Sequence, residues 1–480
     1  MNYGIIKTII GWTLILEAAL MAPSAFVAIL YSEKTALWSF LATMAICFIV
    51  GRMLTWKKPA SQIFFTREGF VSVALSWIAL SIMGGLPFLF SGSIASPIDA
   101  LFETVSGFTT TGASILPSVE ELPRSILFWR SFTHWIGGMG VLVFLLTLLP
   151  MTGGFHMNIM KAESPGPSVS RLVPKVRSTA KILYEIYIGM TILEIVLLLI
   201  GRMPLFDALT LSFGTAGTGG FGIRNDSIAG YSVYHQVVIT IFMILFGINF
   251  NAYFFILMGK AKQAFQIEEV KGYLLIIGVS ILVITANIWH MYGSIAAAFQ
   301  QAAFQVASII TTTGYATTNF DLWPQVSRTI LVMLMFVGAC AGSTGGGIKV
   351  SRFLILQKTV RKELLQYAHP KSVKKIKMDG KSIEHEVVRS TNVFMITYVL
   401  IFAFSILLLA FDNLDLVTNF TAVAATLNNI GPGLELVGPS ANFSGFSNGA
   451  KLVLIFDMLA GRLELFPLLL LFARDTWRKF

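Results

Sequence analysis

The chain has 480 residues, of which 55% are hydrophobic and 12% are charged, and its mean hydropathy is +0.74. A water-soluble globular protein carries about 25% charged residues, so this composition excludes that class and indicates a membrane protein. The net charge of +10 does not point to nucleic acid, because the basic residues gather in a few connecting segments, which is a topology signal in membrane proteins.

The chain begins with two apolar runs, residues 5–30 and 37–50. We expect them to form a transmembrane hairpin within residues 1–66. The first run has no clear small-residue cleavage site and carries Glu17 in its middle, so we interpret it as a retained membrane helix and not as a removed signal peptide.

One sequence unit then occurs four times. Each copy has a long apolar run, a semi-apolar segment of about 12 residues that is too short to span a bilayer, a glycine, a polar stretch and another long apolar run. We place the copies at residues 67–178, 179–268, 269–386 and 387–480. A small residue recurs before the glycine in each copy, at Ser106, Gly214, Ser308 and Ala425.

This pattern predicts an all-α membrane protein with ten transmembrane helices and four re-entrant pore loops. Four fused helix–pore-helix–helix units would surround one pore, and the N-terminal hairpin would precede them. Ten crossings place both chain ends on one side of the membrane. The positive-inside rule makes that side cytoplasmic, because the basic clusters lie in the segments on the same side.

The re-entrant loops suggest a cation pore. Non-helical backbone at membrane depth is tolerated only where it is buried in protein or lines water. Four such loops can meet on one axis, where rings of carbonyl oxygens replace the hydration shell of a cation. Glycine suits the turning point because it adopts left-handed angles cheaply, and threonine hydroxyls can add acceptors below it. The alternative is a set of ordinary Gly/Thr loops, and four copies at equal spacing favour the pore.

Four segments carry a family resemblance: SGFTTTGAS, TGGFG, SIITTTGYATT and NNIGPG. They resemble the filter segments of the Trk/Ktr/HKT superfamily of potassium transporters. The segments HWIGGMG, GACAGSTGGGIK and DMLAGRLELFP are similar to that family too. The resemblance covers essentially the whole chain, and the N-terminal hairpin makes it similar to the TrkH branch. It implies a K+-conducting subunit of the bacterial inner membrane.

The resemblance implies that one glycine of each unit forms the selectivity filter. In the second unit Gly219 is an alternative to Gly220, but the equal spacing and the following Phe221 favour Gly220. The predicted filter residues are Thr110, Thr111, Gly112, Gly219, Gly220, Thr312, Thr313, Gly314, Asn429, Ile430 and Gly431. We expect K+ on the backbone carbonyls of Thr111, Gly112, Gly220, Thr313, Gly314, Ile430 and Gly431.

Glycines also gather in the second helix of the third unit. Three consecutive glycines there are destabilising by roughly 1 kcal/mol each relative to alanine. We therefore expect a flexible intramembrane loop at residues 338–347, below the filter, and the alternative is close helix packing. The resemblance implies that this loop is a gate. Its predicted residues are Gly338, Gly342, Ser343, Gly345, Gly346 and Gly347.

Arg462 lies within the last apolar run. An arginine at the bilayer centre costs at least about 2.5–3.5 kcal/mol, so it must face protein or water. We expect it in the cavity below the filter, where its charge repels cations; the alternative is an ion pair with Asp457 or Glu464. The basic segment 358–389 can set topology and contact anionic lipid, or it can dock a partner.

The resemblance further implies a homodimer and a cytosolic ring of TrkA-type regulatory subunits. A nucleotide (ATP/ADP or NAD) would bind those subunits, because this chain has no G-x-G-x-x-G motif after a strand and no Walker A motif. We expect no covalently bound cofactor, with K+ as the transported ion. An H+- or Na+-coupled cation symporter is the alternative function. An enzyme is not expected, since no His, Cys and carboxylate groups converge in the sequence.

Overall fold

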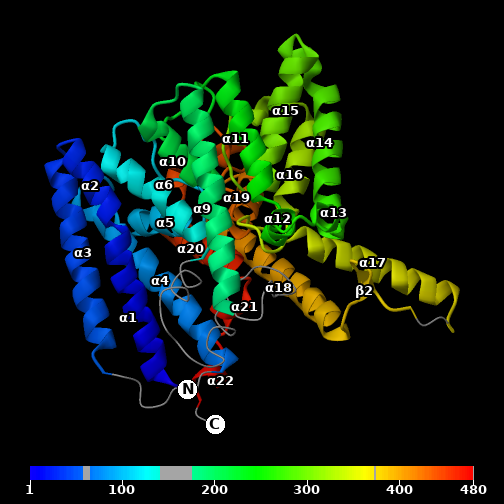
Figure 1. Ribbon diagram of the computed structural model, residues 1–480, viewed down its shortest axis with the longest axis horizontal. Helices are drawn as coiled ribbons and strands as arrows, with labels where there is room; N and C mark the ends of the chain where they lie inside the picture. Colours follow the sequence, from blue (N-terminus) through cyan, green and yellow to red (C-terminus); the bar gives the residue numbers. More distant parts are fainter. Residues whose placement is uncertain (58–64, 141–175, 372–373, 479–480) are drawn as a thin grey trace.

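The computed structural model describes residues 1–57, 65–140, 176–371 and 374–478. Within these ranges the regular secondary structure is helical except for a short antiparallel hairpin of two strands, β1 (Lys377–Met378) and β2 (Lys381–Ser382). The all-α fold predicted from the sequence is therefore confirmed. Both chain termini lie at one end of the helical bundle, which we call the inner end, and the opposite end is the outer end (Figure 1).

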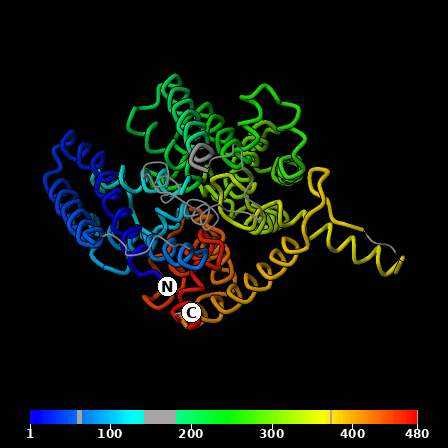
Figure 2. Tube along the Cα trace, turned by 60° about the horizontal axis from the view of Figure 1, so that its bottom comes forward, coloured from blue at the N-terminus to red at the C-terminus, as the bar shows by residue number. Residues whose placement is uncertain are grey.

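The N-terminal hairpin lies at the edge of the bundle (Figure 2). It consists of α1 (Tyr3–Leu20), α2 (Ala22–Leu30) and α3 (Lys34–Thr55). Close packing of α1 on α3 depends on two glycines, because a Cβ atom on Gly11 would lie 2.8 Å from the carbonyl oxygen of Gly51. Small residues allow membrane helices to approach each other in this way.

Four helical units follow. The first has α4 (Thr66–Phe90), α5 (Pro97–Phe108) and α6 (Arg124–Gly138). The second has α9 (Val176–Ile200), α10 (Leu205–Ala216), α11 (Val233–Phe246) and α12 (Phe250–Leu257), and α13 (Ala261–Gln266) leads out of it. The third has α14 (Glu268–Tyr292), α15 (Ile295–Ile310), α16 (Gln325–Phe336) and α17 (Val350–Ala368). The fourth has α18 (His385–Leu409), α19 (Leu416–Leu427), α20 (Asn448–Arg462), α21 (Phe466–Leu469) and α22 (Arg474–Trp477).

Short 3-10 turns lie in the loops of the third and fourth units: η1 (Phe320–Leu322), η2 (Ala410–Asp412), η3 (Glu435–Val437) and η4 (Phe443–Gly445). The long helices that open the units start at residues 66, 176, 268 and 385, beside the predicted unit boundaries at 67, 179, 269 and 387. In Figure 2 the units follow one another around the middle of the bundle, from blue and cyan through green and yellow to orange and red.

Within the described residues, six helices are long and apolar enough to cross a membrane. They are the two arms of the hairpin and the opening helix of every unit: residues 3–30, 34–55, 66–90, 181–200, 268–292 and 385–412. The second helices, α6, α11, α16 and α20, have only 15, 14, 12 and 15 residues. The sequence predicted a break in the second helix of the third unit only. The second helix of the second unit is also broken, because α12 turns from α11 by 93°.

The short re-entrant helices are α5, α10, α15 and α19, with 12, 12, 16 and 12 residues. We call them the pore helices. Three begin with a side-chain N-cap, in which Ser96, Ser294 or Asp415 accepts a backbone N–H, and α10 starts after Pro204. Such caps satisfy the free N–H groups of a helix start. Helices of 12 to 16 residues are too short to span a bilayer, so each chain segment must turn back inside the membrane.

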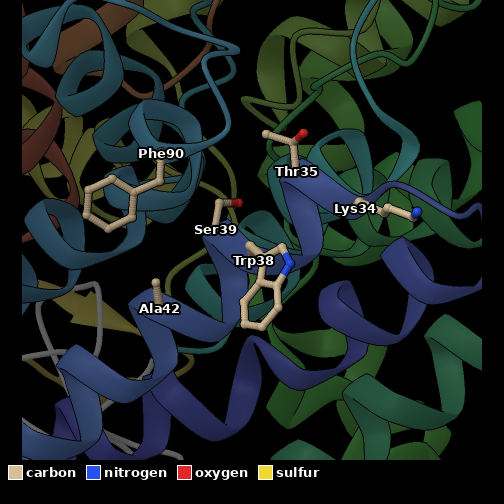
Figure 3. Close-up of a pocket in the computed structure, with 6 residues that line it drawn as sticks. All are labelled: Lys34, Thr35, Trp38, Ser39, Ala42 and Phe90. Carbon is tan, nitrogen blue, oxygen red and sulfur yellow. The ribbon is translucent and has the colours of Figure 1, made fainter.

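Large apolar side chains remain exposed on the outside of the bundle. Trp38, Leu275 and Phe404 are 71%, 66% and 60% exposed, as expected for a surface that contacts lipid. A shallow groove of 360 Å³ lies on this surface. Figure 3 shows its lining, which comes from α3 and the end of α4 and includes none of the predicted filter or gate residues: Lys34, Thr35, Trp38, Ser39, Ala42 and Phe90.

Candidate ion-conduction site

Each pore helix ends in the same hydrogen-bonded turn. In α5 the Thr111 N–H donates to the Ser106 carbonyl at 2.9 Å, and the Thr110 N–H donates to the Gly107 carbonyl at 3.1 Å. This pair of bonds is a Schellman motif. The bond equivalent to Thr111–Ser106 occurs in the other three helices as Gly219 to Gly214, Thr313 to Ser308 and Ile430 to Ala425, at 2.8, 2.9 and 2.8 Å. The small residues that recur in the four sequence units therefore provide the carbonyl groups that accept the hydrogen bonds at the C-terminal ends of the pore helices.

The residue after each helix cap has a left-handed backbone. The φ angles of Thr110, Thr218, Thr312 and Asn429 are 56°, 54°, 60° and 56°. Asparagine tolerates this conformation, but β-branched threonine rarely adopts it. Such strain costs about 1–3 kcal/mol at each residue and persists only where the surroundings impose it. Its occurrence at the same point of all four units indicates a functional constraint.

The four predicted filter glycines form a closed ring. Their φ angles are +76°, +78°, +83° and +100° for Gly112, Gly220, Gly314 and Gly431. A Cβ atom on each would come closer than 3.0 Å to a carbonyl oxygen of the next unit in the chain, and the fourth returns to the first. The glycine–carbonyl pairs are Gly112 with Gly219, Gly220 with Thr313, Gly314 with Ile430, and Gly431 with Thr111.

This ring separates the roles of Gly219 and Gly220. Gly220 has a positive φ, as the filter glycines of the other three units do. Gly219 instead contributes the carbonyl group that packs against Gly112, just as Thr313 contributes the carbonyl group that packs against Gly220. Gly220 is thus the structural equivalent of Gly112 and Gly314. The predicted set of carbonyl ligands left out Gly219, although its carbonyl occupies the same position in the ring as that of Thr313.

A cavity of 210 Å³ opens on the outer side of the ring. Its lining includes all four glycines, Gly112, Gly220, Gly314 and Gly431, together with residues of the loops that follow them. A single cavity therefore borders all four filter segments, as expected if they surround one central pore.

The threonine hydroxyls of the filter segments are engaged by protein groups. Thr109 pairs with Thr111, and Thr311 pairs with Thr313, each at 2.8 Å. The hydroxyl of Thr312, the strained middle residue of its run, accepts a hydrogen bond from the loop on the inner side of the filter. These hydroxyls therefore brace the filter, a role that the sequence did not reveal.

The predicted gate residues lie in an irregular segment between α16 and α17, on the inner side of the filter. The two ends of this segment are joined, because the Gly338 N–H donates to the Ile348 carbonyl at 2.8 Å. The Gly346 N–H donates to Thr312 Oγ1 at 2.7 Å. A Cβ atom on Gly346 would lie 2.7 Å from the Asn428 carbonyl oxygen. The segment, which we call the gate loop, thus packs against the ends of the third and fourth pore helices.

The other predicted gate residues are distributed along this loop. Ser343 and Gly345 are buried, Gly347 is half-buried and has a φ of +68°, and Gly342 is exposed and has a φ of +70°. A Cβ atom on Gly345 would lie 3.0 Å from the Thr311 carbonyl oxygen. Small residues here let the loop approach the filter backbone closely.

Arg462, at the end of α20, joins the gate loop to the rest of the pore. Its guanidinium donates to the Thr344 carbonyl at 2.9 Å, to Thr110 Oγ1 at 3.2 Å and to the Gly138 carbonyl at 2.8 Å. It also donates to the Gly137 carbonyl at the end of α6. These contacts place the arginine between the gate loop, the first filter segment and the end of α6.

The two carboxylates considered as alternative partners of Arg462 make other contacts. Asp457 Oδ1 accepts the Ser405 hydroxyl of α18 at 2.7 Å. Glu464 forms an ion pair with Arg352 of α17. The charge of Glu464 therefore ties the fourth unit to the helix that follows the gate loop.

Two buried charged residues hold the gate loop, and sequence analysis did not single out either. Lys349 is 1% exposed and donates to the Gly345 and Gly346 carbonyls, the latter at 3.0 Å. Lys349 is the last residue of the loop, directly before α17. Glu269 of α14 accepts the Ala341 N–H at 2.7 Å and the Ser351 N–H at 3.0 Å through one oxygen.

A buried ion pair lies behind the first filter segment. Arg130 of α6 lies 2.7 Å from Glu103 of α5, and both side chains are at most 2% exposed. Glu103 also accepts the Ile115 N–H at 3.0 Å, just beyond the filter glycine. Gln305, at the same position in the third unit, donates to Thr317 at 3.2 Å. Both side chains brace the chain segment that leaves the filter, and a charge is not essential for that role.

The comparisons with known proteins agree with this geometry. A family model described as TrkH, cation transport protein, matches residues 37–479. The Trk system potassium uptake protein TrkH of Salmonella typhimurium is 36% identical over 488 residues, and that of Vibrio parahaemolyticus is 37% identical over 487 residues; each match covers 100% of both chains. The Trk system potassium uptake protein TrkG of Escherichia coli is 35% identical and covers 98% of this chain and 97% of the relative.

A solved structure is similar over the full length. It is the crystal structure of the potassium transporter TrkH from Vibrio parahaemolyticus, with a TM-score of 0.89 and 36% sequence identity, covering 100% of each chain. At this identity and coverage the likeness extends to the whole arrangement of helices.

Proposed function

The chain belongs to the TrkH family of cation transport proteins, and we propose that it takes up K+ through the ring of filter glycines at the centre of its four units. The main support is the cyclic packing of each glycine on a carbonyl group of the next unit. Rings of backbone carbonyls are what replaces the hydration shell of K+ in selective pores. Relatives of 35–37% identity are Trk system potassium uptake proteins.

In this proposal the filter carbonyls bind K+ from the outer cavity. The ligands are the carbonyls of the filter glycines and of the residues before them: Thr111, Gly112, Gly219, Gly220, Thr313, Gly314, Ile430 and Gly431. The pore helices add to this site, because their C-terminal ends, which carry partial negative charge, lead directly into the filter. The left-handed residue at the end of each pore helix turns the chain, so that the carbonyl groups that follow it would face the pore.

We propose that the gate loop closes the pore in this conformation. Support comes from its hydrogen bond to Thr312 and from Arg462, which bridges Thr344 of the loop and Thr110 of the first filter segment. An ion that leaves the filter inward would meet the loop backbone and the positive charges of Arg462 and Lys349. Fixed positive charge in a narrow pore raises the electrostatic barrier to cations. Conduction therefore requires the loop to move.

We also propose that the chain forms a homodimer in the bacterial inner membrane, with cytoplasmic termini, and that TrkA-type subunits binding ATP/ADP or NAD control the gate. Support comes from α17, which directly follows the gate loop and extends away from the bundle (Figure 1). Val360, Leu364 and Tyr367 are exposed along it at helical spacing, next to basic residues that also suit anionic lipid. A partner bound to α17 would pull on the loop through Lys349.

One observation favours the alternative, an H+-coupled symporter of the same fold. Glu194 of α9 is fully buried beside Thr215, and it forms no ion pair among the residues that the structure describes. An ionisable group inside the membrane is a candidate for a proton relay. If K+ uptake into liposomes follows an imposed pH gradient in the wild type but not in Glu194→Gln, coupling is supported. K+ uptake that does not depend on the pH gradient supports a channel.

The proposed function is tested by ion flux into proteoliposomes containing the purified protein. A membrane potential generated by a K+ gradient, but not by an equal Na+ gradient, supports a K+ pathway. A wild type without flux is then compared with a variant that lacks Gly345–Gly347. Flux that appears only in the deletion variant supports a closed gate, whereas no flux in either contradicts the proposed function.

A further inference from the structure

The second filter segment differs from the other three in one side chain. The residue before the filter glycine is Thr111, Thr313 or Ile430 in three units, but Gly219 in the second. Gly219 is not among the residues with positive φ, so its backbone does not require glycine. A Cβ atom on Gly219 would overlap the imidazole ring of His134, within 2.6 Å of Cε1 and closer still to Nδ1. The side chain missing from the second unit is therefore replaced by a histidine from the first.

His134 lies on α6, is fully buried and connects two units. Its Nδ1 lies 2.9 Å from the Gly107 carbonyl oxygen of the first pore helix. Its Nε2 accepts the backbone N–H of Phe221, directly after the second filter glycine, at 3.3 Å. A carbonyl oxygen can only accept and an N–H can only donate, so the contacts require a neutral imidazole with its proton on Nδ1. The ring of Phe221 packs on the imidazole with centroids 4.3 Å apart.

Arg130, one turn earlier on α6, holds the next residue of the same segment. It donates to the Gly222 carbonyl at 3.2 Å, and its guanidinium lies 4.1 Å from the Phe221 ring centre. Residues four apart on a helix share one face, so α6 presents both side chains to the second filter segment. The hydroxyl pairs that brace the first and third units, such as Thr311 with Thr313, have no counterpart here, since both equivalent positions are glycine.

We propose that His134 is a positioning residue that sets ion specificity, by fixing the Gly219 and Gly220 carbonyls in place of a threonine side chain. The inference rests on the proposed K+ filter. A carbonyl ring discriminates between ions by the number and placement of its oxygens. Without the imidazole, the N–H of Phe221 loses its acceptor, and the backbone at Gly219 gains room to move. The second segment would then accommodate ions of other sizes.

Two replacements separate hydrogen bonding from packing. Leucine at 134 fills much of the space but cannot bond Gly107 or Phe221, whereas glutamine can donate from its amide nitrogen and accept at its oxygen. We expect His134→Leu, which removes both hydrogen bonds, to lower the K+ over Na+ flux ratio at least about threefold to tenfold, the scale of a single hydrogen bond, and His134→Gln to retain most of the ratio. His235→Gln is the matched control, because His235 contacts Ser232 at the outer start of α11 and not the filter.

A reciprocal pair tests the same contact. Gly219→Ala should disturb selectivity in the presence of His134 and be tolerated in His134→Ala, which makes the two changes strongly non-additive. Each variant is also assayed without flux, by its thermal stabilisation in K+ compared with Na+, which does not need an open gate. This second readout covers any variant that folds but does not conduct.

The outcomes distinguish the inference from the function on which it rests. A selective wild type, an unselective His134→Leu and non-additive Gly219 and His134 changes support it. The inference is overturned if the wild type prefers K+, His134→Leu keeps that preference, and the effects of Gly219→Ala and His134→Ala are additive. The proposed K+ filter would still be supported in that case. If the wild type shows no K+ preference in flux or in stabilisation, both fail together.

Discussion

Thr312 and Gly346 are joined by a hydrogen bond of 2.7 Å, from the N–H of the gate loop to the hydroxyl of the filter segment. Thr312 is also the residue of the third unit that has a left-handed backbone, with a φ of 60°. The loop therefore contacts the filter segment at one of its four left-handed residues. A movement of the loop away from Thr312 would break this bond, so the proposed gating would couple the loop to the filter backbone.

Replacing Thr312 by valine keeps the shape of the side chain and the β-branching but removes the acceptor. We expect the gate loop to leave the filter more often and K+ flux to rise about threefold to tenfold. Thr391→Val is the matched control, since the buried Thr391 hydroxyl bonds only the backbone of its own helix in the described contacts. Equal flux in both variants would show that the Thr312 contact does not hold the gate.

Substitutions of Arg462 separate its charge from its geometry. Lysine keeps the positive charge but cannot reach Thr110, Thr344 and Gly138 together, whereas glutamine removes the charge. We expect about tenfold more flux in Arg462→Gln, the scale of one lost charge-assisted hydrogen bond, and a smaller rise in Arg462→Lys. Flux measured over a range of membrane potentials distinguishes the two variants. A Lys variant as active as the Gln variant would assign the whole effect to geometry.

Glu269 is expected to clamp the gate loop to the first turn of α17, which follows it. One of its oxygens accepts the N–H groups of Ala341 and Ser351, and glutamine offers an equivalent oxygen, so Glu269→Gln should retain the closed loop. Glu269→Ala leaves both buried N–H groups without an acceptor and should destabilise the loop by about 1–3 kcal/mol for each group. Limited proteolysis of the loop and basal K+ flux measure this. A closed, protected loop in Glu269→Ala would refute the clamp.

The buried pair of Glu103 and Arg130 should matter more for stability than for the rate of conduction. Arg130→Met leaves the Glu103 carboxylate buried without its cation, which destabilises a protein by about 3–5 kcal/mol. Replacing both residues by methionine removes the unpaired charge and should recover much of that loss. Unfolding of the detergent-solubilised protein gives both values. A double variant no more stable than Arg130→Met would contradict the ion-pair account.

The repeated architecture could be predicted because backbone geometry imposes residue types locally. A left-handed turn against a neighbouring carbonyl accepts only glycine, so Gly112, Gly220, Gly314 and Gly431 carry a signal that survives in a single sequence. The short pore helices follow from segment length alone. The burial of Arg462 against protein groups was also predictable, because a charge within an apolar run must face protein or water.

The remaining parts of the site depend on contacts between residues that are distant in the chain. Glu269 is 72 residues from Ala341, and His134 is 87 residues from Phe221, so no local pattern links them. Lys349 has basic neighbours in the sequence, as a connecting segment would, although its side chain is buried against the loop. The hydroxyl pairs of the threonine runs likewise need the folded turn before their role is visible.

The central claim is that the four glycines form one selective ring, and Gly112→Ser in proteoliposomes tests it most directly. A serine Cβ at this position would overlap the Gly219 carbonyl oxygen of the neighbouring unit, so the variant should lose most of the K+ over Na+ preference of the wild type. Gly92→Ser is the control, because Gly92 has a similar φ of +74° with nothing within 4 Å of its Cβ position, and it should keep that preference. A Gly112→Ser protein as selective for K+ as the wild type would contradict the account.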